Sequence, residues 1–370
     1  MRMKIDSVSI LYRTTPLKTP FVTSLRRVES AEAFIVAFHA GNLTGYGSAS
    51  PTAAITGDTS GSIVCALRDY LIPRIIGKEL SPELLDMLDS SLIHNTSPKA
   101  ACDIALYDLL SQQAGLPLYA YLGGSGAKTL ESDITIALGT PEKMAHDTAA
   151  AIADGWNILK IKLGTGADDD IARLEAIAPL VSGSGVTIRL DANQGWSEND
   201  TIRVEAHCTK LGLSPELIEQ PLKFYESSSK LAETLSIPLL ADESVFSDRD
   251  AKRILETRQA SMINIKLMKS GGISGALKIC DTAREYGAKG CMLGCMLEDT
   301  VGIIAAAHLA CARSEITMYD LDAAMLCEYV PCSSSTVFQG RFITPTESRK
   351  GLGIYNIGKA SEICTISQTA

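Results

Sequence analysis

The sequence has few of the residues on which several common catalytic schemes depend. It contains only five histidines among 370 residues, so a serine or cysteine nucleophile that needs a neighbouring imidazole has little support. His308 lies in the apolar run IIAAAHLACA and is expected to be a packing or surface residue. No glycine-rich fingerprint follows a first strand, which argues against a dinucleotide-binding site.

Long apolar runs and an excess of basic charge are also missing. No hydrophobic stretch is long enough to span a bilayer, and the start, MRMKIDSVSILYRTTP, lacks the apolar core of a signal peptide. The formal net charge of −9 argues against nucleic acid or an anionic membrane as the main partner. The ten cysteines are scattered, and Cys291 and Cys295 lack further partners for zinc. We therefore expect a cytoplasmic protein with free thiols.

The first part of the chain, residues 1–130, predicts an α+β unit because strand-like segments precede helical ones. Alternating or apolar segments indicate strands at residues 4–12 and 33–40, followed by helices at residues 63–76, 82–92 and 98–114. Residues 14–28 and 45–61 are expected to be mobile or exposed loops.

Residues 131–323 show a strand–helix alternation that repeats every ~25–30 residues, as repeated β/α units do. The predicted strands are SDITIAL, NILKIKL, TIRLDAN, ELIEQP, IPLLADE, MINIKL, GCMLGC and TMYDLD. Eight short apolar strands with helices between them favour a (β/α) barrel over an open sheet. Residues 324–370 are expected to return to the first part. Because barrel active sites lie at the carboxyl ends of the strands, polar residues there should converge.

Three acidic residues stand at the ends of three consecutive predicted strands: Asp191, Glu219 and Asp242. A single carboxylate in such a place often caps the next helix or turn, but three on successive strands favour one shared site. Carboxylate oxygens bind hard divalent cations, whereas zinc would bring histidine or cysteine. The sequence therefore predicts a Mg²⁺ site.

Lysines flank this acidic series in the chain. Lys160 and Lys162 share parity on the preceding strand and should both face the barrel axis, and Lys266 ends the following strand. A lysine within a strand is usually a solvated charge. Here mutual repulsion and a nearby cation should lower the amine pKa, so that Lys162 and Lys266 act as acid and base on opposite faces of a substrate. Lys269 is expected to be a surface charge.

Asp320 and Asp322 share parity on the last predicted strand. Two carboxylates on one face are costly unless a cation lies between them. This pattern fits either a salt bridge to a protein lysine or a pocket for the ammonium group of a substrate.

The set formed by Lys160-Ile161-Lys162, the three carboxylates and Lys266 resembles the enolase superfamily, and specifically its muconate-lactonizing-enzyme subgroup. Within that subgroup NIKLMKSGGI and Asp320-Leu321-Asp322 are similar to dipeptide epimerases, above all those acting on L-Ala-D/L-Glu. The likeness covers nearly the whole chain. It implies a (β/α)7β TIM-like barrel with an α+β capping domain formed by the N-terminal part and the C-terminal tail.

The resemblance also implies roles for individual residues. Asp320 and Asp322 would bind the α-ammonium group of a dipeptide. The stretch from Thr23 to Val28 resembles a capping loop whose arginine recognises a glutamate side chain, with Arg26 the best match and Arg27 next. A second capping loop, which includes Thr52 and Ile55, would also face the substrate.

Together these residues predict a Mg²⁺-dependent isomerase that epimerises a small-molecule dipeptide at the α-carbon of its C-terminal residue. Lys160 would help the cation to stabilise the charge that builds on the carboxylate. Dehydration, as in o-succinylbenzoate synthase, and cycloisomerisation of a muconate stay open as alternatives, although their substrates lack an ammonium group. A catalytically silent binding barrel is a more remote alternative. The physiological dipeptide, homo-oligomerisation and a role in cell-wall peptide metabolism stay open.

Overall fold

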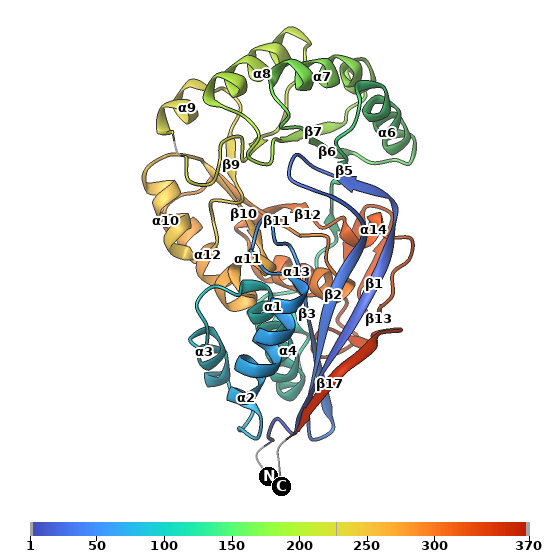
Figure 1. Cartoon of the computed structure of the whole chain (residues 1–370), viewed down its shortest axis with the longest axis vertical. Helices are drawn as coiled ribbons and strands as arrows, with labels where there is room; N and C mark the ends of the chain where they lie inside the picture. The colour runs from blue at the N-terminus through green and yellow to red at the C-terminus, as the bar shows by residue number, and fades with distance from the viewer. Residues whose placement is uncertain (1–2, 227, 368–370) are drawn as a thin grey trace.

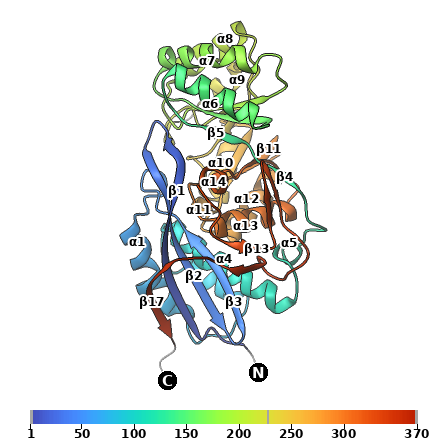
Figure 2. The same cartoon turned by 90° about the vertical axis from the view of Figure 1, so that its right-hand side faces the viewer.

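Two sheets of different kinds carry the architecture of the computed structural model, which describes residues 3–226 and 228–367. An antiparallel sheet has the order β17 (Ser361–Ser367), β1 (Ser7–Val22), β2 (Arg27–Ala40) and β3 (Leu43–Ala49). A parallel sheet of eight strands forms the barrel. Figures 1 and 2 show the antiparallel sheet and its helices below the barrel, with the β1–β2 hairpin rising to one side of it.

The β1–β2 hairpin replaces the loop expected at residues 14–28. The two strands pair almost to their tips, with Phe21 opposite Val28, and the backbone N–H of Thr23 donates to the carbonyl of Arg26 across the turn. Buried and exposed side chains alternate from Arg13 to Lys18, as they do in a strand with one covered face. The expectation was therefore wrong, and the hairpin carries its tip to the barrel.

Helices cover one face of the antiparallel sheet. They are α1 (Ser60–Cys65), η1 (Ala66–Leu71), α2 (Ile72–Ile75), α3 (Glu83–Asp89) and α4 (Thr96–Ala114), whereas the short α5 (Leu118–Tyr121) after them packs on α4 and the barrel. The first three are continuous and fill the predicted helix at residues 63–76. α4 is buried on nearly every side because it packs on the sheet with one face and on the barrel with another. Its mixed, non-periodic apolar pattern reflects this double burial.

The barrel strands match the eight predicted apolar segments. They are β5 (Ile134–Ile136), β6 (Ile158–Lys162), β7 (Thr187–Asp191), β8 (Ile218–Glu219), β9 (Leu239–Ala241), β10 (Met262–Lys266), β11 (Gly290–Gly294) and β12 (Ile316–Asp320). Each neighbour pair is parallel. A backbone hydrogen bond of 3.1 Å from Asp133 N–H to the Tyr319 carbonyl joins the first and last strands. The predicted barrel is confirmed.

Helices alternate with these strands and cover the barrel from outside, as Figure 1 shows. They are α6 (Pro141–Ala153), α7 (Ala167–Val181), α8 (Glu198–Lys210), α9 (Ser229–Thr234), α10 (Asp248–Glu256), α11 (Leu267–Ser270), α12 (Ile273–Glu285), α13 (Thr300–Ala312) and α14 (Ala323–Leu326). Leu159 and Ile161 belong to the core between β6 and these helices. The alternate residues Lys160 and Lys162 therefore face the barrel interior, as their parity predicts.

The chain after the barrel runs back to the antiparallel sheet, where β17 pairs with β1. On the way it forms small sheets from β13 (Ser333–Ser334) with β16 (Ile354–Asn356), and from β14 (Val337–Gln339), β15 (Phe342–Thr344) and β4 (Leu130–Glu131). The domain boundaries at 130/131 and 323/324 stay a prediction. Within the described ranges, no helix has the length and hydrophobicity needed to cross a membrane.

Strand β3, which sequence reasoning placed in a loop, yields a stability prediction. A Cβ atom on Gly47 would lie 1.9 Å from the carbonyl oxygen of Ala101 in α4, whereas one on Gly61 would meet open space. Gly47→Ala should therefore destabilise the protein by about 2 kcal/mol or more, because sheet and helix must separate. Gly61→Ala, the control, should be neutral or slightly stabilising. Urea unfolding measures both, and equal midpoints would show that β3 does not lie against α4.

Candidate active site

Strand register brings the predicted site residues to one edge of the barrel. Lys162 pairs with Asp191, and Asp191 pairs in turn with Glu219 on the next strand. Asp242 follows β9, and Lys266 ends β10. At the far side Lys266 pairs with Gly294, which pairs with Asp320. Because parallel strands end together at one mouth, these side chains converge there.

The three carboxylates predicted to hold Mg²⁺ are fully buried and surrounded by ammonium groups. Lys160 Nζ lies 2.7 Å from Glu219 and 3.2 Å from Asp191. Lys162 Nζ lies 2.6 Å from Asp191, and Lys266 Nζ lies 2.7 Å from Asp242. Buried carboxylates need such compensation, since an unpaired charge in the interior is expensive.

Lys269 was expected to be a surface charge, and the structure shows that this is wrong. Its side chain is 1% exposed, and its Nζ lies 2.6 Å from Asp242 Oδ1. The short helix α11 turns the residue back under the mouth instead of letting it follow the chain to the surface. Burial lowers the pKa of Lys269, and the carboxylate of Asp242 opposes this effect.

Without a bound cation, two of the amines do not have the lowered pKa that was expected beside one. Burial lowers the pKa of Lys160, but Asp320, Glu219 and Asp191 outweigh it and raise the pKa well above its ordinary value. Burial also lowers the pKa of Lys266, but Asp242 outweighs it, so the pKa is raised. Neighbouring carboxylates stabilise the charged amine more than the other lysines destabilise it.

The carboxylates respond to this setting differently. Burial raises the pKa of Asp191, but Lys162 and Lys160 outweigh it and hold the pKa below its usual value. Burial, with Asp191 adding to it, raises the pKa of Glu219 to about 7. Burial and the adjacent Asp242 raise the pKa of Glu243, which sequence reasoning missed, to about 8. Glu243 directly follows the predicted ligand Asp242, so its position in the sequence could have suggested a place in the site.

The backbone is strained just after two of the carboxylates. Asn193, Gln194 and Gln220 have φ values of 40°, 68° and 35°, in a region that residues other than glycine rarely adopt. The strain has compensation: Asp191 Oδ1 accepts from the N–H of Asn193 at 2.9 Å, and Gln220 Oε1 accepts from the N–H of Asp242 at 2.9 Å. Such outliers cluster at functional sites, and these three residues lie directly after Asp191 and Glu219 in the chain.

A second acidic group lies beside the first. One carboxylate oxygen from each of Asp133, Asp320 and Asp322 lies within 4.8 Å of the others, and all three residues are buried. Asp320 is 2.7 Å from Lys160 Nζ, Asp322 accepts from the N–H of Thr135 at 2.8 Å, and Asp133 pairs with Arg189 at 2.7 Å. Asp320 therefore forms the salt bridge to a protein lysine that was one of the two expectations, and the ammonium pocket stays a prediction.

Asp133 was missed because it precedes its strand, whereas functional residues were expected at the carboxyl ends of strands. The available signal was its parity with Thr135 in SDITIAL, where the two polar residues alternate with Ile134 and Ile136. Burial, with Asp320 adding to it, raises the pKa of Asp133 well above its usual value, although Arg189 opposes the shift. Its Oδ1 accepts no hydrogen bond.

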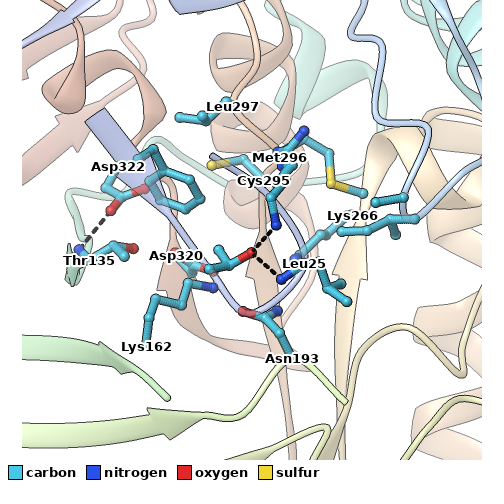
Figure 3. Close-up of a pocket in the computed structure, with 15 residues that line it drawn as sticks. Leu25, Thr135, Lys162, Asn193, Lys266, Cys295, Met296, Leu297, Asp320 and Asp322 are labelled. Carbon is cyan, nitrogen blue, oxygen red and sulfur yellow. Dashed lines mark hydrogen bonds between the residues drawn. The ribbon is translucent and has the colours of Figure 1, made fainter. Parts of the chain in front are cut away.

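A cavity opens above these groups, and Figure 3 shows its lining. Lys162 and Lys266 reach it from different strands, and Asp320 and Asp322 face it together with Thr135. Cys295, Met296 and Leu297 line another side. A wider cleft of about 750 Å³ adjoins the cavity and shares Leu25, Ala54 and Ile55 with it.

The capping segments contribute unequally to this cavity. Arg26 and Ile55 line it. Arg27 points elsewhere, with 60% of its side chain exposed and a 3.4 Å contact to Glu29. Thr52 is buried, its carbonyl accepts from the N–H of Ile55 at 2.9 Å, and it is not among the described residues that line the cavity. The structure thus brings Arg26 to the site and leaves Arg27 outside.

The donor set at Asp191, Glu219 and Asp242 fits magnesium. It offers oxygen ligands only, as Mg²⁺ prefers. Glu219 Oε2 and Asp242 Oδ1 accept no well-oriented hydrogen bond although ammonium groups lie close by, so both retain lone pairs for a cation. At the second acidic group a guanidinium and a backbone N–H already take up oxygens of Asp133 and Asp322.

Comparison with known proteins identifies the family of the chain. Residues 5–123 match the family described as "Mandelate racemase / muconate lactonizing enzyme, N-terminal domain", and residues 143–356 match "Enolase C-terminal domain-like". The chain therefore belongs to the mandelate racemase/muconate lactonizing enzyme family of the enolase superfamily.

Individual relatives are more specific. The chain is 43% identical over 96% of its length to an L-Ala-D/L-Glu epimerase of Clostridium acetobutylicum, and it covers 99% of that protein. The substrate-liganded structure of the L-Ala-D/L-Glu epimerase from Bacillus subtilis superposes with a TM-score of 0.92 at 40% identity, covering 96% of this chain and 99% of that one. A dipeptide epimerase from Enterococcus faecalis, solved with Mg and L-Leu-L-Tyr, has a TM-score of 0.89 at 35% identity, with coverages of 96% and 100%.

The ion pair beneath the second acidic group leads to a prediction. Arg189 donates to Asp133, to Glu216 and to the carbonyl of Tyr319. Arg189→Met should lower the free energy of unfolding by about 3 kcal/mol, because Asp133 would be left beside Asp320 without its cation. Arg203→Met, which removes an exposed arginine paired with Asp168, should change it by less than about 0.5 kcal/mol. Similar losses for both variants in denaturant unfolding would contradict the assignment.

Proposed function

We propose that this protein catalyses the Mg²⁺-dependent epimerisation of a dipeptide at the α-carbon of its C-terminal residue, with L-Ala-L-Glu and L-Ala-D-Glu as the substrate pair. The observation that carries the proposal is the placement of Lys162 and Lys266 on separate strands at one cavity, with three buried carboxylates at the intervening strand ends. The names of the relatives from C. acetobutylicum and B. subtilis support the choice of dipeptide.

The proton transfer is the work of the two lysines. The amine of one lysine removes the α-proton, and the ammonium group of the other returns a proton to the opposite face. Their roles exchange in the reverse direction. The lysine that removes the proton must be neutral, and the lysine that returns one must be charged. The reaction therefore starts from a pair with one neutral and one charged lysine.

Asp191, Glu219 and Asp242 would hold the cation. When bound, Mg²⁺ supplies positive charge that stabilises the substrate carboxylate as negative charge builds on it. Lys160, fixed between Glu219 and Asp320, adds a second positive charge directed at the same carboxylate.

Asp320 and Asp322 would bind the α-ammonium group at the other end of the dipeptide. Burial raises the pKa of Asp322 to about 6, with Asp320 adding to the shift. An ammonium group bound beside it would stabilise the charged form of this carboxylate. The lyase and cycloisomerase alternatives are disfavoured because their substrates lack this group. The cytoplasmic location, homo-oligomerisation and role in cell-wall peptide metabolism stay predictions.

The two-lysine scheme predicts a split between epimerisation and exchange. Lys162→Ala and Lys266→Ala should each reduce epimerisation of L-Ala-L-Glu by at least about 10³-fold, because each removes the acid–base group on one face. Each variant should still exchange the α-proton of the one epimer presented to its remaining lysine. Proton NMR in D₂O with Mg²⁺ measures both processes. Near wild-type epimerisation by both variants would rule out the assignment.

The position of Arg26 predicts specificity. A guanidinium that meets a glutamate side chain in a closed site gives a charge-assisted contact, which can be bidentate. Arg26→Ala should therefore reduce kcat/KM for L-Ala-L-Glu more than kcat/KM for a dipeptide with a neutral second residue. The difference should correspond to about 2–3 kcal/mol of transition-state binding free energy. Arg27→Ala, whose side chain faces outward, is the matched control and should keep the preference. An unchanged preference in the Arg26 variant would leave only the broader dipeptide epimerase assignment.

A further inference from the structure

Lys269 is the buried ammonium group at the barrel mouth that the proposed chemistry does not use. Its side chain is 1% exposed, and it does not line the cavity among the described residues. The ring of Phe246 lies 5.9 Å from its Nζ. An amine in this position cannot meet substrate, so its role must be exercised through its neighbours.

Three oxygens surround this ammonium group. Nζ donates to the carbonyl of Asp242 at 2.5 Å and to the carbonyl of Asn264 at 3.0 Å, and it lies 2.6 Å from Asp242 Oδ1. An ammonium group has three N–H bonds and no acceptor. The two carbonyls accept two of these bonds, and the carboxylate oxygen lies within ion-pair distance. Asp242 follows β9 and Asn264 belongs to β10. Lys269 therefore ties together the ends of the strands that carry Asp242 and Lys266.

The carboxylate of Asp242 is held from both sides. Its Oδ2 is 2.7 Å from Lys266 Nζ, and its Oδ1 faces Lys269. The side chain of Asn264 extends the same network by donating to Glu219 at 2.8 Å. At the other end of the acidic series, Asp191 Oδ1 instead accepts from the backbone N–H of Asn193. Asp191 also has lysine partners, since Lys162 and Lys160 both contact its Oδ2. Among the three carboxylates, Lys269 contacts Asp242, so its own effect falls on the Lys266 side.

We propose that Lys269 is a positioning residue that fixes the carboxylate of Asp242 for the cation and fixes Lys266 for its proton transfer. The effect on proton transfer by Lys266 rests on the proposed function, whereas the effect on cation binding by Asp242 does not. A purely structural brace would lower stability and act equally on both halves of the reaction. A positioning residue confined to one side changes cation affinity and impairs one face of the substrate more than the other.

Lys269→Met keeps the length and apolar stem of the side chain and removes the charge and all three donors. Lys278→Met is the matched control, since this lysine follows on α12 and is 56% exposed. Isothermal titration calorimetry with Mg²⁺ alone should show a dissociation constant raised about tenfold or more for Lys269→Met, as expected when a group orienting a ligand is lost. Lys278→Met should match the wild type.

The second measurement is α-proton exchange in D₂O at saturating Mg²⁺. The epimer that Lys162→Ala still exchanges defines the face served by Lys266. For Lys269→Met, exchange of that epimer should fall at least about tenfold more than exchange of the other. An unchanged Mg²⁺ dissociation constant, or equal loss of exchange for both epimers, overturns the proposal.

Two safeguards keep the outcomes separate. If Lys269→Met shows no cooperative thermal unfolding, the same two measurements on Lys269→Gln decide, because glutamine keeps a short donor without the charge. If the wild type exchanges no dipeptide proton at all, the proposed function fails, and the Mg²⁺ titration still decides whether Lys269 positions Asp242.

Discussion

Mutual compensation of buried charge is the constraint on which the site depends. Carboxylates and ammonium groups meet at the barrel mouth within about hydrogen-bonding distance, and neither set could be buried without the other. Lys160 shows this most clearly, since it contacts Asp191, Glu219 and Asp320 while wholly buried. Because each charge is held by charges from other strands, the site exists only when the barrel is closed.

The fold supplies this closure by register. Parallel pairing places Lys162, Asp191 and Glu219 side by side at one level, and the backbone bond between Asp133 and Tyr319 joins the two ends of the sheet. The antiparallel sheet then brings a segment from far away in the chain, because the long β1–β2 hairpin delivers Arg26 to the cavity. Under the proposed function, the barrel supplies the chemistry, and the hairpin and the loop near Ile55 contact the distal part of the substrate.

The barrel and its principal acidic and basic residues could be predicted from the sequence because buried parallel strands form short apolar runs. A charged residue that ends such a run stands out. The same rule failed for Asp133, which precedes its strand, and for Lys269, which follows one and is turned back by α11. The hairpin at residues 14–28 was missed because its polar positions resemble a loop. The direction of the lysine pKa shifts depends on distances to carboxylates on other strands, and a linear sequence does not contain these.

The central claim is that the cation belongs between Asp191, Glu219 and Asp242, not in the neighbouring acidic group. Mn²⁺ binds the oxygen sites that Mg²⁺ uses, so a crystal grown with Mn²⁺ can locate the cation by its anomalous scattering. The account predicts one strong peak in contact with all three carboxylates. A peak bound instead by Asp133, Asp320 and Asp322, with none at the predicted ligands, would contradict it.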